Sequence, residues 1–464
     1  MVAAGLGGKG GLAVIGLGLV VAIGVALLRS STSAVLLWFA AALFGDAVGG
    51  VSTLSPDRLA FLAVLAVWLI EVATGRHQIP RFGATEVFMF SYVAWLVGSA
   101  IMPHAYRATT LEGGDQSVIT LIQTSAFVPF ALFIVARTAM RSRAAVASFL
   151  WFLVAIGTYL SLTNCFQFLG PKSLVWPRSI LDSKWIGRAA GIFDQPIITG
   201  FAISIALAAA VLLASSRDIN HRWLAAVAII PMGPAIYFTH SRSPLLGTAL
   251  ILIGGLLFAR SFRTGFAILT AVAALLVVVN WSTFTSSDRE KGGVTSQNEV
   301  DDRLNGIATS LAAIQEKPIF GHGIGRFAQV NTFEHKQFGL TDWRRGYGIA
   351  SHETELGIAT EVGLVGFGLW VAVLVSLLAK VGRAWRVLPR SGIDGQSFAA
   401  LFFIIFVAWI ANGLTLDIRF FDVANGVVFC WAGIAVGCGE RAVEERAASS
   451  SGARFPRDRR WGSR

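Results

Sequence analysis

Four basic side chains stand near the ends of apolar segments or, for Arg303, at the start of a helix in a large loop, and their types suit the binding of an anion. Arg188, Arg242 and Arg303 carry guanidinium groups, and His352 carries an imidazole just before a further apolar segment. One guanidinium group can bind two phosphate oxygens at once, and it keeps its charge at physiological pH. An imidazole, with a reference pKa of about 6.5, can accept a proton at neutral pH, and nearby guanidinium charge keeps it unprotonated. If these positions converge, the sequence predicts arginines that hold a phosphate ligand beside a histidine base.

Two further residues join this candidate site. His240 stands two positions before Arg242 in a short turn between apolar runs, so it could contact the ligand. Glu361 lies near one end of the apolar run 354–380 and could orient an arginine, with a structural Arg–Glu pair as the alternative. The alternative for Arg188 and Arg242 is that each lies at the membrane interface with its charge extended into water. The alternative for His352 is a capping contact at the start of a helix.

The composition is that of an integral membrane protein. Of 464 residues, 55% are hydrophobic and 14% are charged, whereas soluble proteins have about 25% charged residues. Because a span needs roughly 20 residues, the apolar content could fill on the order of 12 spans. The net charge of +11 lies mostly in short Lys and Arg runs between apolar segments. That placement is typical of topology signals and argues against a nucleic-acid partner.

The apolar runs predict an all-α polytopic membrane protein with about 12 to 13 transmembrane helices. The short, Gly-rich run 34–51 could form a bent or half-inserted helix. The three cysteines lie inside apolar runs without Cys-x-x-Cys spacing, which argues against a metal centre or a disulfide framework. The runs lie at 11–28, 34–51, 59–75, 85–103, 117–138, 145–167, 195–214, 222–239, 243–260, 263–281, 354–380, 397–415 and 420–438.

Charge orients these spans and divides the chain. Connectors rich in Lys and Arg alternate with poorer ones, so the positive-inside rule assigns the basic set to the cytoplasm. The predicted parts are an N-terminal bundle at 1–281, a large outer loop at 282–353, C-terminal helices at 354–440 and a basic cytoplasmic tail at 441–464. The tail has no apolar face, so it should be mobile and could contact anionic membrane lipid.

The large outer loop contains an amphipathic helix. Asp301 and Asp302 precede it, Lys317-Pro318 ends it, and apolar residues recur at three- and four-residue steps between them: Leu304, Ile307, Leu311 and Ile314. The helix should lie on the membrane surface or pack over the bundle. Arg303 then serves the site or pairs with one of the two aspartates. The Gly-x-Gly-x-Gly run at 321–325 predicts a tight turn, since no strand precedes it as a Rossmann site requires.

The order of these motifs resembles the O-antigen ligase and polymerase superfamily. The resemblance covers 188–380, and one departure is that Glu353 and Thr354 follow the histidine, where the family commonly has Asn and an aromatic residue. The motifs are Arg-x-x-Gly-x-Phe-x-x-Pro at 188–196, Ser-Arg at 241–242, Lys-Pro-Ile-Phe-Gly-His-Gly-Ile-Gly-Arg-Phe at 317–327 and Glu-Val-Gly-Leu-Val-Gly-Phe at 361–367.

This resemblance implies a bacterial inner-membrane glycosyltransferase with a GT-C-like helical bundle. Such enzymes take a glycan from undecaprenyl pyrophosphate on the periplasmic side and pass it to lipid A core or to a lipid-linked repeat unit. By the resemblance, Arg188, Arg242 and Arg303 hold the pyrophosphate and His352 activates the acceptor hydroxyl.

Further expectations concern the reaction itself. The sequence has no Asp-x-Asp motif, so we expect no cofactor and a metal-independent transfer. Direct attack of the acceptor on the anomeric carbon should invert its configuration. A lipid-linked-glycan transporter or flippase is the alternative. It should show internal repeats and broken segments at mid-membrane depth, and no convincing repeat is evident.

Overall fold

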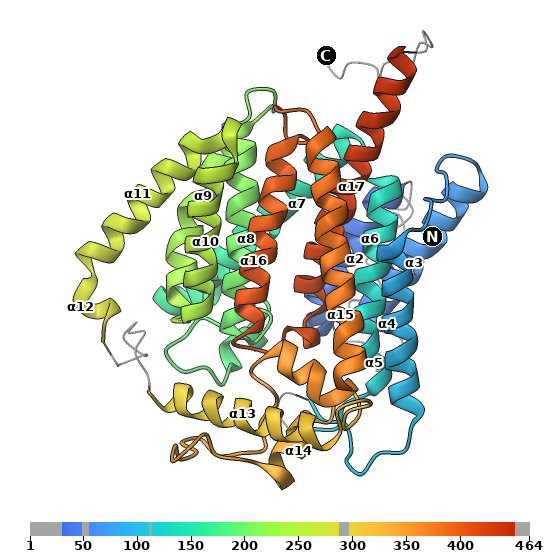
Figure 1. Cartoon of the computed structure of the whole chain (residues 1–464). Coiled ribbons are helices and arrows are strands. Elements are labelled where there is room, and N and C mark those ends of the chain that lie inside the picture. Colours follow the sequence, from blue (N-terminus) through green and yellow to red (C-terminus); the bar gives the residue numbers. More distant parts are fainter. Residues whose placement is uncertain (1–29, 49–54, 111–113, 287–296, 451–464) are drawn as a thin grey trace, which may run out of the picture.

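The computed structural model describes residues 30–48, 55–110, 114–286 and 297–450, and helices are their regular elements (Figure 1). The N-terminal helices are α2 (Ser31–Val48), α3 (Pro56–Ala73), α4 (Ala84–Ile101), α5 (Val118–Ile122), α6 (Val128–Ala139), α7 (Arg143–Leu169), α8 (Pro196–Ser215), α9 (Arg222–Phe238), α10 (Arg242–Phe258), α11 (Arg263–Val279) and α12 (Trp281–Phe284). The others are α13 (Gln297–Glu316), α14 (Phe327–Glu334), α15 (Thr354–Val387), α16 (Gln396–Gly413) and α17 (Asp422–Ser450).

The fold class predicted from the sequence is confirmed. Within the described residues, eight helices are long and apolar enough to cross a membrane, and three shorter helices are also apolar. Every predicted run from 34–51 onward coincides with a helix, whereas the run 11–28 lies outside the described residues. The helix α2 is uninterrupted over its described length.

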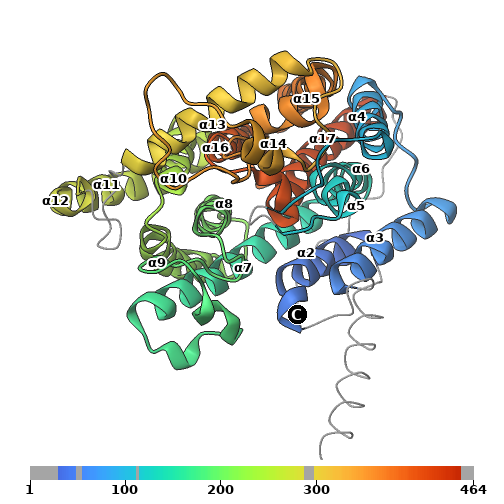
Figure 2. The same ribbon diagram turned by 90° about the horizontal axis from the view of Figure 1, so that it is seen from below.

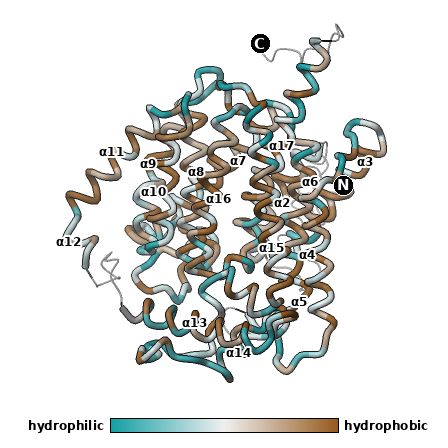
Figure 3. The backbone as a smooth tube through the Cα atoms, in the orientation of Figure 1, coloured by the Kyte–Doolittle hydropathy of each residue, from teal (hydrophilic) through white to brown (hydrophobic). Residues whose placement is uncertain are grey.

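Close helix packing forms the core of the bundle. The most deeply buried spans are α8 and α17, and α17 runs against α6. Glycine makes this approach possible: a Cβ atom at Gly433 would stand 2.4 Å from the Phe133 carbonyl oxygen, and one at Gly437 would stand 2.3 Å from that of Arg137. Hydrophobic residues cover the long helices, and hydrophilic residues gather at the two ends of the bundle (Figure 3).

The two ends of the bundle differ. Helices α13 and α14 lie across one end, which we call the site end (Figures 1 and 2). The basic connectors lie at the opposite end, where Arg143 pairs with Asp218 at 3.1 Å and Arg441 with Asp394 at 2.5 Å. The prediction from charge, that the connectors rich in Lys and Arg share one end of the bundle, agrees with this arrangement.

A buried ion network also lies at the basic end. Arg137 is 5% exposed and bonds Glu86 at 2.7 Å and Glu440 through Nε at 2.9 Å. Lys380 bonds the same Glu86 carboxylate. The four groups come from α6, α4, α17 and α15, so this basic connector joins helices in addition to carrying a topology signal.

The glycine turn at 321–325 packs into a break in α15. Gly363 has φ 70° inside the helix, which interrupts the backbone ladder there. The freed groups pair with the turn: the Leu364 amide donates to the Pro318 carbonyl at 2.7 Å, and the Gly323 amide donates to the Glu361 carbonyl at 2.7 Å. Two of the motifs that carried the family resemblance therefore form one structural unit.

Candidate functional site

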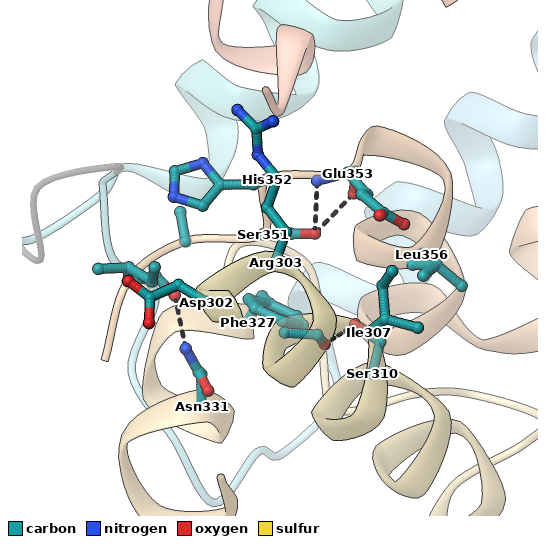
Figure 4. Close-up of a pocket in the computed structure, with 13 residues that line it drawn as sticks. Asp302, Arg303, Ile307, Ser310, Phe327, Asn331, Ser351, His352, Glu353 and Leu356 are labelled. Carbon is teal, nitrogen blue, oxygen red and sulfur yellow. Dashed lines mark hydrogen bonds between the residues drawn. The ribbon is translucent and has the colours of Figure 1, made fainter. Parts of the chain in front are cut away.

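His352 and Arg303 share one pocket at the site end. The Arg303 side chain rises from α13 beside the His352 imidazole, which stands in the turn that leads into α15 (Figure 4). The Ser351 hydroxyl fixes that turn, because it donates to the Glu353 carbonyl at 2.6 Å and accepts from the Glu353 amide at 3.1 Å. The pocket is lined by Asp302, Arg303, Gly306, Ile307, Ser310, Phe327, Asn331, Ile349, Ala350, Ser351, His352, Glu353 and Leu356.

The pocket keeps the imidazole neutral. Burial lowers the pKa of His352 to about 4, and the positive charges of Arg345 and Arg303 act in the same direction against the weaker opposite effect of nearby acids. Burial raises the pKa of Glu353, although Arg303 opposes this. At neutral pH the imidazole therefore has a lone pair available to accept a proton.

Two loop arginines hold the acidic start of the amphipathic helix. Arg344 donates through Nε to Asp301 at 3.1 Å, and Arg345 donates through Nε to Asp302 at 2.8 Å. The backbone amide of Arg344 also bonds Asp302 at 2.6 Å. Sequence reasoning missed both arginines, which lie 43 residues further along the chain. Their contacts anchor α13 across the site end of the bundle, and Arg303 lines the pocket.

A second cluster surrounds the α9–α10 turn. Arg188, in the loop before α8, donates to the Ser241 hydroxyl at 2.6 Å and to the Thr239 carbonyl at 3.3 Å. Its guanidinium lies over the Trp185 ring, 4.7 Å from the ring centre. Arg242 is the first residue of α10, next to Ser241. Two of the three arginines predicted to bind pyrophosphate, Arg188 and Arg242, therefore lie at one turn.

His240 packs inside this second cluster. Its imidazole is 3% exposed and contacts the rings of Phe168 and Tyr237 edge-on. Nδ1 bonds the Gly187 carbonyl at 2.8 Å, and the residue itself has φ 43°. These contacts tie the turn to the Arg188 loop, which gives His240 a positioning role in the structure.

A connected set of hydrogen bonds joins the two clusters. Ser243, beside Arg242, accepts a hydrogen bond from Thr415 at 2.8 Å. The next residue, Leu416, has its carbonyl bonded by Thr354 at 3.1 Å. Thr354 begins α15 two residues after His352. The starts of α10 and α15 therefore both bond to the loop after α16, at the same end of the bundle.

A comparison with known protein families identifies the central part of the chain. A family model described as O-antigen ligase matches residues 226–371. This segment is therefore similar to the O-antigen ligase family, and we call it the O-antigen ligase segment. No curated protein matches the chain. The match supports membrane glycan transfer of the ligase or polymerase type, and it confirms the resemblance drawn from the motif order.

The O-antigen ligase segment holds most of the candidate site. It includes Arg242, Arg303 and His352, whereas Arg188 precedes it. The hydrogen bond from Arg188 to Ser241 ties the residue outside the segment to the turn inside it. Arg188 therefore contacts the matched segment at the α9–α10 turn, although it lies outside that segment in the sequence.

Glu361 of the O-antigen ligase segment forms a buried charge cluster. Arg419 donates to Glu361 at 2.7 Å and to Asp417 through Nη2 at 2.6 Å, and each of these side chains is at most 4% exposed. Glu361 also accepts from the Phe327 amide at 3.0 Å. The structure thus has the Arg–Glu pair that the sequence left as one of two possibilities, with an arginine that sequence reasoning did not select. A charged Leu-Asp-Ile-Arg-Phe stretch (416–420) between two apolar runs was the available signal.

Proposed function

We propose that this protein transfers a glycan from undecaprenyl pyrophosphate to a sugar acceptor on the periplasmic face of the bacterial inner membrane. The acceptor is lipid A core or a lipid-linked repeat unit. The observation that carries the proposal is the shared pocket of Arg303 and the neutral His352, at the bundle end where Arg188 and Arg242 also lie. Arginines neutralise the leaving pyrophosphate, and the histidine serves the acceptor.

The proposed step is a single inverting displacement. His352 takes the proton of the acceptor hydroxyl as that oxygen bonds to the anomeric carbon. The bond from that carbon to the pyrophosphate oxygen breaks, and its electron pair leaves with undecaprenyl pyrophosphate. Arg188, Arg242 and Arg303 stabilise the negative charge on the leaving group. The residues named supply the base and the charge neutralisation, so we propose that the step needs no metal ion.

An apolar groove supports a lipid-linked donor. It runs between α9, α10 and α11, and α11 leans away from the other two helices (Figure 1). Its lining includes Tyr237 and Phe238, which directly precede the turn that carries Arg242. A polyprenyl chain in this groove has its apolar surface covered while its pyrophosphate reaches the α9–α10 turn.

A transfer assay with purified components tests the proposal. The full chain is reconstituted with undecaprenyl-pyrophosphate glycan and acceptor, with and without chelator, next to the Arg242→Ala variant. We expect equal initial rates with and without chelator, and a rate in Arg242→Ala lower by about 100-fold or more, because a charge facing the leaving group is lost. Translocation of the lipid-linked glycan without transfer would instead establish a flippase. A rate that disappears with chelator while the protein stays folded would refute the metal-free step.

The pH dependence of the reaction follows from the pKa of His352. A base must be deprotonated to act, so kcat/KM should stay level as the pH falls from 8 to about 5 and decline only near the free-protein pKa of about 4. Bound pyrophosphate offsets the charge of Arg303, which raises the pKa of His352 and shifts the decline of kcat to higher pH. Initial rates across this range, with activity regained at pH 7 as the control for unfolding, test this. A decline of kcat/KM near pH 6.5 would contradict it.

A further inference from the structure

Three side chains with metal-binding atoms converge where the end of α13, the glycine turn and the end of α14 meet. Glu316 ends α13, His322 lies in the glycine turn, and Glu334 ends α14. One potential ligand atom from each of them lies within 4.8 Å of the other two. The three residues come from three different elements, so their approach is a product of the fold and was not evident from the sequence.

His322 presents a ring nitrogen to this cluster in a form that could bind a metal. The residue is 2% exposed, and its Nε2 lies 3.2 Å from the Ala313 carbonyl oxygen. Since a carbonyl only accepts, Nε2 carries the proton and Nδ1 keeps its lone pair. This Nδ1 is buried and has no hydrogen-bond partner among the described residues. A second ring nitrogen bonded to a backbone carbonyl is the usual arrangement of a metal-binding histidine.

The Glu334 carboxylate is oriented by the Tyr106 phenol, which donates a hydrogen bond to its Oε1. Tyr106 also lies parallel to the Phe333 ring at 5.6 Å and faces the His322 ring at 6.4 Å. The phenol therefore orients one carboxylate beside the imidazole, and a second carboxylate, that of Glu316, lies close to it at the protein surface.

We propose that Glu316, His322 and Glu334 bind one divalent first-row transition ion, with Zn²⁺ as its model. One imidazole nitrogen and two carboxylate oxygens suit this class of ion, whereas Ca²⁺ takes about 6 to 8 oxygen ligands. Tetrahedral Zn²⁺ with bonds of about 2.1 Å needs ligand atoms roughly 3.4 Å apart. The exposed Glu316 side chain can turn to close this distance. The ion neutralises the two carboxylates and leaves one position for water.

This ion acts on structure rather than on the transfer step. It links the end of α13, the glycine turn and the end of α14, and the same two helices supply Arg303, Ser310, Phe327 and Asn331 to the His352 pocket. The backbone of His322 is itself fixed to α15, because its amide donates to the Thr360 carbonyl at 2.9 Å. Binding of the ion therefore stabilises the layer that covers the pocket.

Zinc titration of the metal-stripped full chain tests this site. We expect calorimetry to give one Zn²⁺ per chain, and the unfolding temperature of the tag-free protein in detergent to rise on addition of Zn²⁺. His322→Gln and Glu316→Gln should each weaken binding by at least roughly 10-fold and remove the rise. Glu316 is exposed, so its variant is the one expected to fold unchanged. His335→Gln is the matched control, because His335 is an exposed histidine one residue beyond α14 that stacks on Tyr347.

Two results would overturn the site. One is a wild-type chain that shows no Zn²⁺-dependent rise. The other is a rise of equal size in wild type, His322→Gln and Glu316→Gln, which would assign the effect to other groups. Neither result depends on glycan transfer, so the metal site and the proposed reaction stand or fall separately. With Co²⁺ as the probe, the visible absorption of a four-coordinate ion gives a second readout of the same site.

Discussion

His352→Ala should lower kcat for glycan transfer by about 100- to 10,000-fold, the usual contribution of a general base. The imidazole has its pKa lowered to about 4, so it is neutral at pH 7 and the substitution removes a base without removing a charge. The arginines proposed to hold the donor stay in place. We therefore expect KM for the donor to change little, and steady-state rates over a donor series at pH 7 separate the two constants.

The control for this variant is His335→Ala. His335 is exposed and lies at the same end of the bundle, stacked on Tyr347, outside the pocket. It should keep the wild-type rate. Both variants should keep the wild-type unfolding temperature, since His352 lines the pocket and His335 is exposed, and neither belongs to the hydrophobic core. A His352→Ala protein that transfers glycan at the wild-type rate would exclude His352 as the base.

The membrane fold was predictable because apolar length alone encodes a span. Each described helix of the bundle corresponds to an apolar run, and the amphipathic helix was found from its periodicity, with α13 ending at Glu316 before Lys317-Pro318. Pro318 cannot continue the helix, which explains the accuracy at that boundary. The alternation of basic connectors likewise predicted which connectors share an end of the bundle. This prediction depends on the charge of each connector and needs no knowledge of helix packing.

Features that depend on contacts between distant segments were not predictable. The π-helical turn Gln123–Phe127 between α5 and α6 has no signal in hydropathy. Arg137 has the sequence context of an ordinary topology signal, yet it is buried between Glu86 and Glu440, which lie on other helices. Hydropathy describes each segment alone, whereas such partners are chosen by packing.

The candidate site was predictable only in part, because residue types can be read from the sequence whereas their partners depend on packing. Residue type and position at a span entry selected His352, position at the start of the loop helix and the family resemblance selected Arg303, and the structure brings the two into one pocket. The same criteria selected His240, whose ring is buried between Phe168 and Tyr237. They did not select Arg419, which bonds Glu361 and Asp417. Chemistry can be inferred from residue types, but burial and partners come only with the fold.

Gly363→Ala should destabilise the protein by roughly 3 kcal/mol or more, the largest stability effect we expect from adding a single methyl group to this chain. Gly363 has φ 70°, which costs alanine about 1 to 2 kcal/mol. In addition, a Cβ atom would stand 2.1 Å from the Ile319 carbonyl oxygen. A backbone atom cannot move aside as a side chain can. Removing this clash therefore requires the two segments to separate, which breaks the hydrogen bond from the Leu364 amide to the Pro318 carbonyl.

The matched variant is Gly368→Ala, five residues further along the same helix. Gly368 has helical geometry, is exposed, and has open space where its Cβ would stand. Alanine there should be neutral or stabilising by about 0.5 to 1 kcal/mol. Unfolding temperature and the monodisperse fraction in detergent compare the two variants. Since the α15 break holds the glycine turn, and the turn leads into α14 at the His352 pocket, Gly363→Ala should also reduce transfer. Equal stability of the two variants would show that the break in α15 does not hold the turn.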